Sequence, residues 1–207
     1  MAFFAAVLAL VGVTTAHEAG HYLAVRVKRL QVLRVRIGQG PLVWRGRHRG
    51  AELLLRLVPI GGRIQYESVP PGFGEAVVAV SGAAANLALA LLAFAVAGLL
   101  TAPVLPMAPG DANVIAYAAS HAGAWFWAVP GALIELVATG SAVELSRGVR
   151  VLGELVMARP LPSLPYVVGA LSALWAALNL LPVPFIETDG WHVARSLWRG
   201  IARGWTR

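Results

Sequence analysis

The sequence has no cysteine and few charged residues. Asp, Glu, Lys and Arg make up 13% of its 207 residues, whereas 58% are hydrophobic. Without cysteine the chain can form no disulfide and can offer no thiolate to a metal ion, so any metal site must use histidine and carboxylate ligands. The shortage of charge is typical of a membrane protein rather than of a soluble globular domain.

Long runs of the chain contain no charged side chain at all. The longest are residues 76–110, 112–134 and 160–186, and the first 17 residues also lack charge. Each of the three exceeds the ~20 residues that a helix needs to cross the hydrocarbon. We therefore expect a multi-pass, α-helical integral membrane protein. A signal peptide cleaved after Ala16 is the alternative for the N-terminus, but the first basic residue is Arg26, and a signal peptide begins with a basic segment.

The basic residues are concentrated in two segments. Ten of the 17 Lys and Arg residues lie between Arg26 and Arg63, and four lie in the last 13 residues. A basic run can indicate nucleic acid, but beside apolar spans it favours the cytoplasmic surface of a membrane. We expect membrane lipids and no nucleic acid as partners, and location in the cytoplasmic membrane of a prokaryote.

The order of apolar, turn-rich and basic stretches predicts one membrane-embedded domain over residues 1–207. Its core is three helices that carry the functional site, with a small membrane-associated β-sheet after the first. Alternating arginine and β-branched residues punctuated by glycine indicate the sheet. The predicted parts are a helix at 2–25, a re-entrant β region at 30–67, a helix at 74–101, outer-side immersed or surface helices within 112–158, a helix at 165–181, a ligand-bearing turn at 182–190 and an interfacial tail at 191–207.

The stretch HEAGH places three polar side chains inside the first apolar helix. His17 and His21 are four residues apart, so a helix presents both imidazoles on one face, where they can bind one Zn²⁺. Glu18 lies beside them and can accept a proton from an attacking water. The structural alternative is a pair of histidines that cap a helix end. Ionisable groups within a span are costly, however, and are therefore functional candidates.

A catalytic zinc needs a third protein ligand. Two carboxylates follow the last apolar helix, after prolines that could fold the chain back into the membrane. The candidates are His48, His121, His192, Glu187 and Asp189.

Four motifs together resemble the site-2 protease family of intramembrane zinc metalloproteases. They are HEAGH, VPIGG, SGAAAN and NLLPVP with a later DG, and they extend over residues 10–192. The resemblance implies that two histidines and the DG aspartate bind zinc, that the motif glutamate is the general base, and that the partner is a transmembrane protein substrate. The implied residues are His17, His21 and Asp189 for zinc, Glu18 for catalysis, and Asn86, Asn179, Gly61 and Gly62 for substrate binding.

Two departures from the family pattern affect these assignments. Ala83 stands where the family has proline, and Asn179 and Asp189 are ten residues apart, whereas the family spacing is eight. Glu187 falls at the family spacing, but Gly190 follows Asp189 and favours the aspartate.

The sequence thus predicts a zinc-dependent intramembrane endopeptidase. The first alternative is a catalytically inactive homologue that binds membrane-protein segments, and the second is a membrane metal-binding or transport protein. The histidines of the first helix and Asp189 after the last helix can bind the same zinc only if an even number of membrane crossings lies between the second and last helices of the core. We therefore expect residues 112–139 to stay on the outer side.

Overall fold

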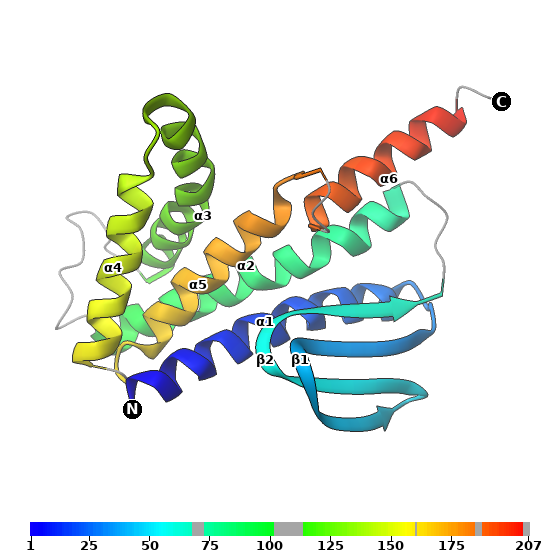
Figure 1. Cartoon of the computed structure of the whole chain (residues 1–207), viewed down its shortest axis with the longest axis horizontal. Helices are drawn as coiled ribbons and strands as arrows, with labels where there is room; N and C mark the ends of the chain where they lie inside the picture. The colour runs from blue at the N-terminus through cyan, green and yellow to red at the C-terminus, as the bar shows by residue number, and fades with distance from the viewer. Residues whose placement is uncertain (68–72, 102–113, 160, 185–187, 205–207) are drawn as a thin grey trace. The chain divides into compact units, whose positions relative to one another are not determined.

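The computed structural model describes residues 1–67, 73–101, 114–159, 161–184 and 188–204, with six helices and two strands in these ranges (Figure 1). In chain order they are α1 (Ala2–Val27), β1 (Val32–His48), β2 (Ala51–Tyr66), α2 (Phe73–Thr101), α3 (Val114–Thr139), α4 (Val143–Ala158), α5 (Leu164–Leu180) and α6 (Asp189–Gly204). The predicted class, a helical membrane protein with a small sheet after the first helix, is confirmed.

Three of the helices have the length and composition of membrane spans. They are α1, α2 and α3, while α5, with 17 residues, is a shorter apolar helix. This supports the membrane assignment. The expectation that residues 112–139 stay on the outer side of the membrane remains a prediction.

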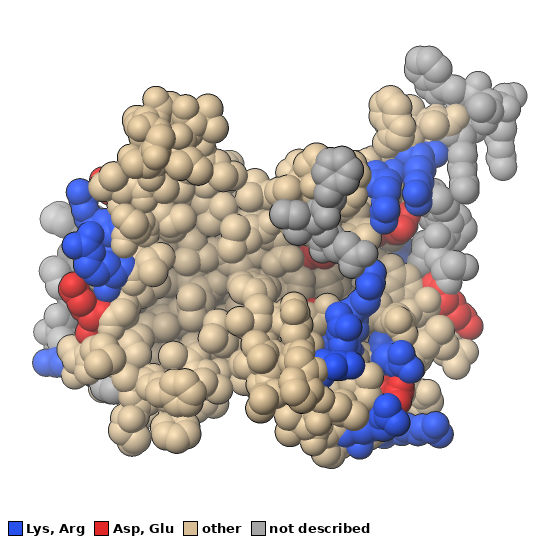
Figure 2. Space-filling model, in the orientation of Figure 1, with Lys and Arg blue, Asp and Glu red and all other residues tan. Residues whose placement is uncertain are grey.

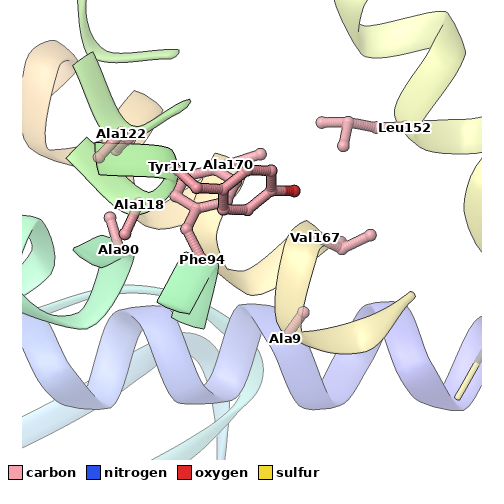
Figure 3. Packing of buried hydrophobic residues seen from close by; sticks show 10 residues of the cluster. Ala9, Ala90, Phe94, Tyr117, Ala118, Ala122, Leu152, Val167 and Ala170 are labelled. Carbon is pink, nitrogen blue, oxygen red and sulfur yellow. The ribbon is translucent and has the colours of Figure 1, made fainter. Parts of the chain in front are cut away.

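The chain forms two compact units, and α1, α2 and α5 each contribute to both. The first unit comprises Met1–Val13 and Asn86–Ala177, and the second comprises Thr14–Ala85 and Leu178–Arg207. The first unit is built on a core of alanines around two aromatic rings, Phe94 and Tyr117 (Figure 3). Small side chains let helices approach closely, which is how helices associate in lipid, where the hydrophobic effect is absent.

In the first unit, α3 and α4 form a helical hairpin. Gly140 adopts a positive φ of 74° in the turn, and the Glu135 carboxylate accepts a hydrogen bond from the backbone N–H of Val143, the first residue of α4. Leu152 of α4 is buried in the aromatic core. His121 of α3 lies beside Tyr117, with ring centroids 4.0 Å apart, and its Nδ1 is 2.9 Å from the Tyr117 carbonyl oxygen.

In the second unit, β1 and β2 are antiparallel and both bend. Residues 32–37 of β1 pair with residues 62–66 of β2 in antiparallel register on one side, and residues 34–37 pair on the other side with residues 52–55, where both strands run in the same direction. Gly38 and Gly40 have φ of 83° and 78°, and Gly61 has φ of 66°. These left-handed conformations suit glycine and place the bends between the paired segments. The predicted small β-sheet is present, and both of its strands fold back on themselves.

The helices of the second unit meet through small residues as well. A Cβ on Gly20 of α1 would lie 2.7 Å from the Cβ of Ala85 of α2 and closer still to the Ser81 carbonyl oxygen. The sheet is tied to α1 by a hydrogen bond of 2.9 Å from Thr14 to the carbonyl oxygen of Pro59. These contacts hold the middle of α1 against α2 and β2.

Candidate metal centre

Three side chains from two helices of the second unit converge on one point. The Nε2 atoms of His17 and His21 are 3.2 Å apart. One oxygen of Asp189 lies 3.2 Å from the His17 Nε2, and the other lies 3.4 Å from the His21 Nε2. Among the described residues these three form the group of histidines and carboxylates that could hold a metal ion.

The spacing of these atoms fits zinc. Zinc–ligand distances of about 2.0–2.1 Å at tetrahedral angles separate neighbouring ligand atoms by ~3.3 Å. The separations of 3.2, 3.2 and 3.4 Å between the ligand atoms match this edge length. Two imidazoles and one carboxylate also match the ligand count of catalytic zinc sites, which keep the fourth position open.

A backbone contact sets the tautomer of His21. Its Nδ1 lies 2.8 Å from the carbonyl oxygen of Val78 in α2. A carbonyl only accepts, so the Nδ1–H donates and the Nε2 keeps its lone pair for a metal. The Ser81 hydroxyl also donates to the Val78 carbonyl oxygen, at 2.6 Å, so this carbonyl accepts hydrogen bonds from both Ser81 and His21.

Glu18 is buried beside the ligands, with 4% of its surface exposed. Its Oε2 has no hydrogen-bond partner among the described residues, and a buried carboxylate oxygen without a partner is costly. A Cβ on Gly62 of β2 would lie 2.5 Å from Oε1 of Glu18. Gly62 therefore leaves room for the carboxylate. The family resemblance implied a role in substrate binding for Gly62, and the structure places it beside Glu18.

The end of α5 and the start of α6 position Asp189, which is the first residue of α6. The Thr188 hydroxyl caps this helix by accepting from the N–H of Trp191 at 3.2 Å, and it donates to the Leu181 carbonyl oxygen at 2.7 Å. Gly190 packs so closely on this chain end that a Cβ would lie 2.7 Å from the Leu181 carbonyl carbon. The DG pair thus combines the candidate ligand Asp189 with Gly190, which lets α6 pack closely against the end of α5.

Gly82 of α2 faces both histidines, which the sequence did not reveal. A Cβ there would lie 2.8 Å from the Nε2 of His17 and would meet the Nε2 of His21 at even shorter range. The small residues of SGAAAN indicated close helix packing, and Ala85 has that role. Gly82 keeps the space in front of the ligand atoms open. In the sequence Gly82 is one small residue among several in SGAAAN, and only its contact with the histidines identifies it as part of the site.

We expect the substitution Gly82→Ala to weaken zinc binding by roughly 10–100-fold, the range seen when groups that orient ligands are altered. The added methyl group meets the ligand nitrogens and forces one imidazole to turn. Zinc affinity is measured by competition with a chelator of known strength. Gly12→Ala is the matched control, because this glycine lies on α1 with nothing within 4 Å of the added Cβ. Equal zinc affinity in the two variants would contradict the assigned contact.

The remaining predicted residues have varied positions. Asn179 is half-buried near the end of α5 in the second unit. Asn86 is fully buried in the first unit, where its backbone carbonyl oxygen accepts a hydrogen bond from the Ser172 hydroxyl at 3.0 Å. Gly61 forms the bend of β2. The roles of Asn86, Asn179, Gly61 and Gly62 in substrate binding stay predictions. Glu187, the alternative ligand, lies outside the described residues.

The other histidines weighed as third ligands lie elsewhere. His121 belongs to the aromatic core of the first unit. His48 is exposed at the end of β1, and His192 is within 3.1 Å of the Arg195 guanidinium on α6.

Comparison with known proteins gives one family and three relatives. The model of peptidase family M50 matches residues 5–206. A Nostoc protein provisionally named a zinc metalloprotease is 28% identical over 108 residues, which are 44% of this chain and 30% of the relative. A Pasteurella multocida protein with the same kind of name is 32% identical over 109 residues, 44% of this chain and 25% of the relative. A third, from Thermotoga maritima, is 39% identical over 59 residues, 28% of this chain and 12% of the relative. The matches thus span less than a third of each relative's length.

Proposed function

The chain belongs to peptidase family M50, and on that premise we propose that it is a zinc-dependent endopeptidase that cleaves transmembrane segments of other membrane proteins. One observation carries the proposal. His17, His21 and Asp189 meet with zinc-like spacing, and Glu18 is buried beside them on an apolar helix long enough to span a membrane.

The chemistry follows from these side chains. When bound, zinc polarises a carbonyl oxygen and lowers the pKa of water, which supplies the electrophile and the nucleophile of peptide hydrolysis. His17, His21 and Asp189 would hold it. Glu18 takes a proton from the attacking water and returns it to the amine that leaves. The 4% exposure of Glu18 keeps bulk water from competing for that proton.

The sheet supports the proposed choice of substrate. Residues 62–66 of β2 pair with β1 on one side, and within the described part of the chain no strand pairs with their other side. An extended peptide can add to such an edge through backbone hydrogen bonds. Since the amides of a helix are engaged in their own hydrogen bonds, a transmembrane substrate must first unwind near the scissile bond. Gly62 touches Glu18, so the edge ends at the general base.

We further propose the orientation that the charge distribution favours. The basic segment 26–63 lies on the cytoplasmic side of a prokaryotic cytoplasmic membrane. The exposed apolar side chains of α6, Leu197, Trp198 and Ile201, rest in the lipid interface on the same side.

The test is cleavage of a single-span protein by the purified chain in neutral detergent. We expect product with a new terminus inside the apolar segment, located by mass spectrometry. We expect a chelator to stop the reaction and added zinc to restore it, because His17, His21 and Asp189 would hold the zinc that the reaction needs. Cleavage outside the apolar segment would contradict the intramembrane assignment, and cleavage unaffected by the chelator would contradict the zinc assignment.

A further inference from the structure

Helix α6 has a buried side and an exposed side of different composition. Residues four apart lie on one side of a helix. Ser196 is buried and Gly200 is partly buried, so the buried side is made of small residues. The exposed side carries Leu197 and Ile201, together with Trp198. These three side chains are 41%, 58% and 73% exposed, and we call them the apolar face of α6.

This arrangement is the reverse of the one in a soluble protein, where a surface helix turns its apolar stripe to the core. Residues three and four apart are neighbours on the surface of a helix, so the three side chains form one patch. A contiguous exposed apolar patch marks a surface that contacts protein or lipid. The apolar face therefore calls for an occupant other than water.

Positive charge beside the apolar face indicates an anionic bilayer as that occupant. Residues 190–207 contain four arginines and no Asp or Glu. Arg199 is exposed and follows Trp198, and Arg195 lies one turn earlier, where its guanidinium donates a hydrogen bond to His192 Nδ1 at 3.1 Å. Figure 2 shows basic side chains at α6 as well as over the sheet. Acyl chains cover apolar side chains, and anionic headgroups raise the affinity about fivefold for each arginine near the surface.

The same helix carries a candidate zinc ligand in its first turn. Asp189 is the first residue of α6, and its two oxygens lie 3.2 Å from His17 Nε2 and 3.4 Å from His21 Nε2. The Thr188 hydroxyl holds this first turn to the end of α5. Beyond it, Ser196 is the one buried side chain that the structure describes between residues 193 and 202. A contact that fixes the later turns of α6 therefore also fixes the direction in which its first residue points.

We propose that α6 makes the metal centre dependent on lipid. The apolar face enters the acyl region of a bilayer that contains anionic lipid, Arg199 binds the headgroups, and this contact holds Asp189 beside the two histidines. The inference rests on the proposed zinc chemistry and adds the regulation of that site by the membrane. Coupling between two binding events is reciprocal, so the anionic bilayer tightens zinc binding and zinc tightens the contact of α6 with the bilayer.

Zinc affinity of the full chain in lipid nanodiscs tests the proposal, with one copy in each disc. The discs contain phosphatidylcholine alone or with an equal part of phosphatidylglycerol. We expect zinc to bind roughly 5–150-fold more tightly in the anionic discs, the usual size of coupling between two sites. An anionic surface also concentrates zinc ions around any protein, so the decisive comparison is between variants in the same anionic discs.

Arg199→Gln should lose most of the increase in zinc affinity, and Arg199→Lys, which retains the charge, should keep it. Arg150→Gln is the matched control, because it removes the same charge from an exposed position on α4 in the first unit. An equal increase in Arg199→Gln and the wild type would overturn the coupling alone. A wild-type protein that binds no zinc in either disc would overturn the proposed function and the coupling together.

Quenching of tryptophan fluorescence by brominated lipid gives a second readout, which does not depend on catalysis. The chain has seven tryptophans, so the contribution of Trp198 is the difference between the wild type and Trp198→Phe. We expect this contribution to be quenched in anionic discs and the quenching to increase when zinc is added. Absence of quenching would overturn the lipid contact. Zinc affinity that rises only with two copies in each disc would overturn it in favour of contact between copies of this chain.

Discussion

Replacing Glu18 by glutamine should reduce cleavage by roughly 100–10,000-fold, the contribution of a positioned general acid–base group. Glutamine has the same shape, so it fits against Gly62, but it cannot take a proton from water. Zinc content should not change, because Glu18 is not one of the three grouped ligands. The measurement is the initial rate of product formation together with zinc content for each purified protein.

Glu144→Gln is the control for the loss of one carboxylate. Glu144 is exposed on α4 and pairs with Arg147, so this change should leave the rate unaltered. Cleavage by Glu18→Gln at the wild-type rate would refute the assigned base. A wild-type protein that binds zinc and the substrate without cutting it would instead fit the inactive homologue.

Replacing Asp189 by alanine should remove zinc and activity together. The change leaves two histidines, and the loss of affinity should exceed the roughly 10–100-fold that accompanies changes in groups behind the ligands. Zinc is measured by elemental analysis after dialysis, and activity on the same sample. The purified variant must keep its helical circular dichroism, which separates loss of metal from loss of fold.

Glu187→Ala is the matched comparison, because it removes a carboxylate two residues away in the same segment. We expect it to keep most of the zinc and most of the activity. The reverse result, with zinc lost in Glu187→Ala and kept in Asp189→Ala, would give the ligand role to Glu187.

Local patterns in the sequence determined much of this protein. The charge-free runs predicted apolar helices: α1, α2 and α3 have the length and composition of membrane spans, whereas the run 160–186 contains the shorter apolar helix α5. The HEAGH spacing placed His17 and His21 on one helix face, because the period of a helix is local. The motifs also indicated the family before any geometry was available.

Only the tertiary structure decided what joins those parts. The sequence favoured Asp189 over Glu187 as the third ligand but could not place either residue. In the structure Asp189 lies beside the histidines, because Thr188 caps α6 and Gly190 packs on the end of α5, while Glu187 lies outside the described residues. Gly82 and the carbonyl of Val78 were not predicted as parts of the site. Such contacts join segments about 60 to 170 residues apart, and no local period encodes which backbone atom will face a side chain after the helices pack.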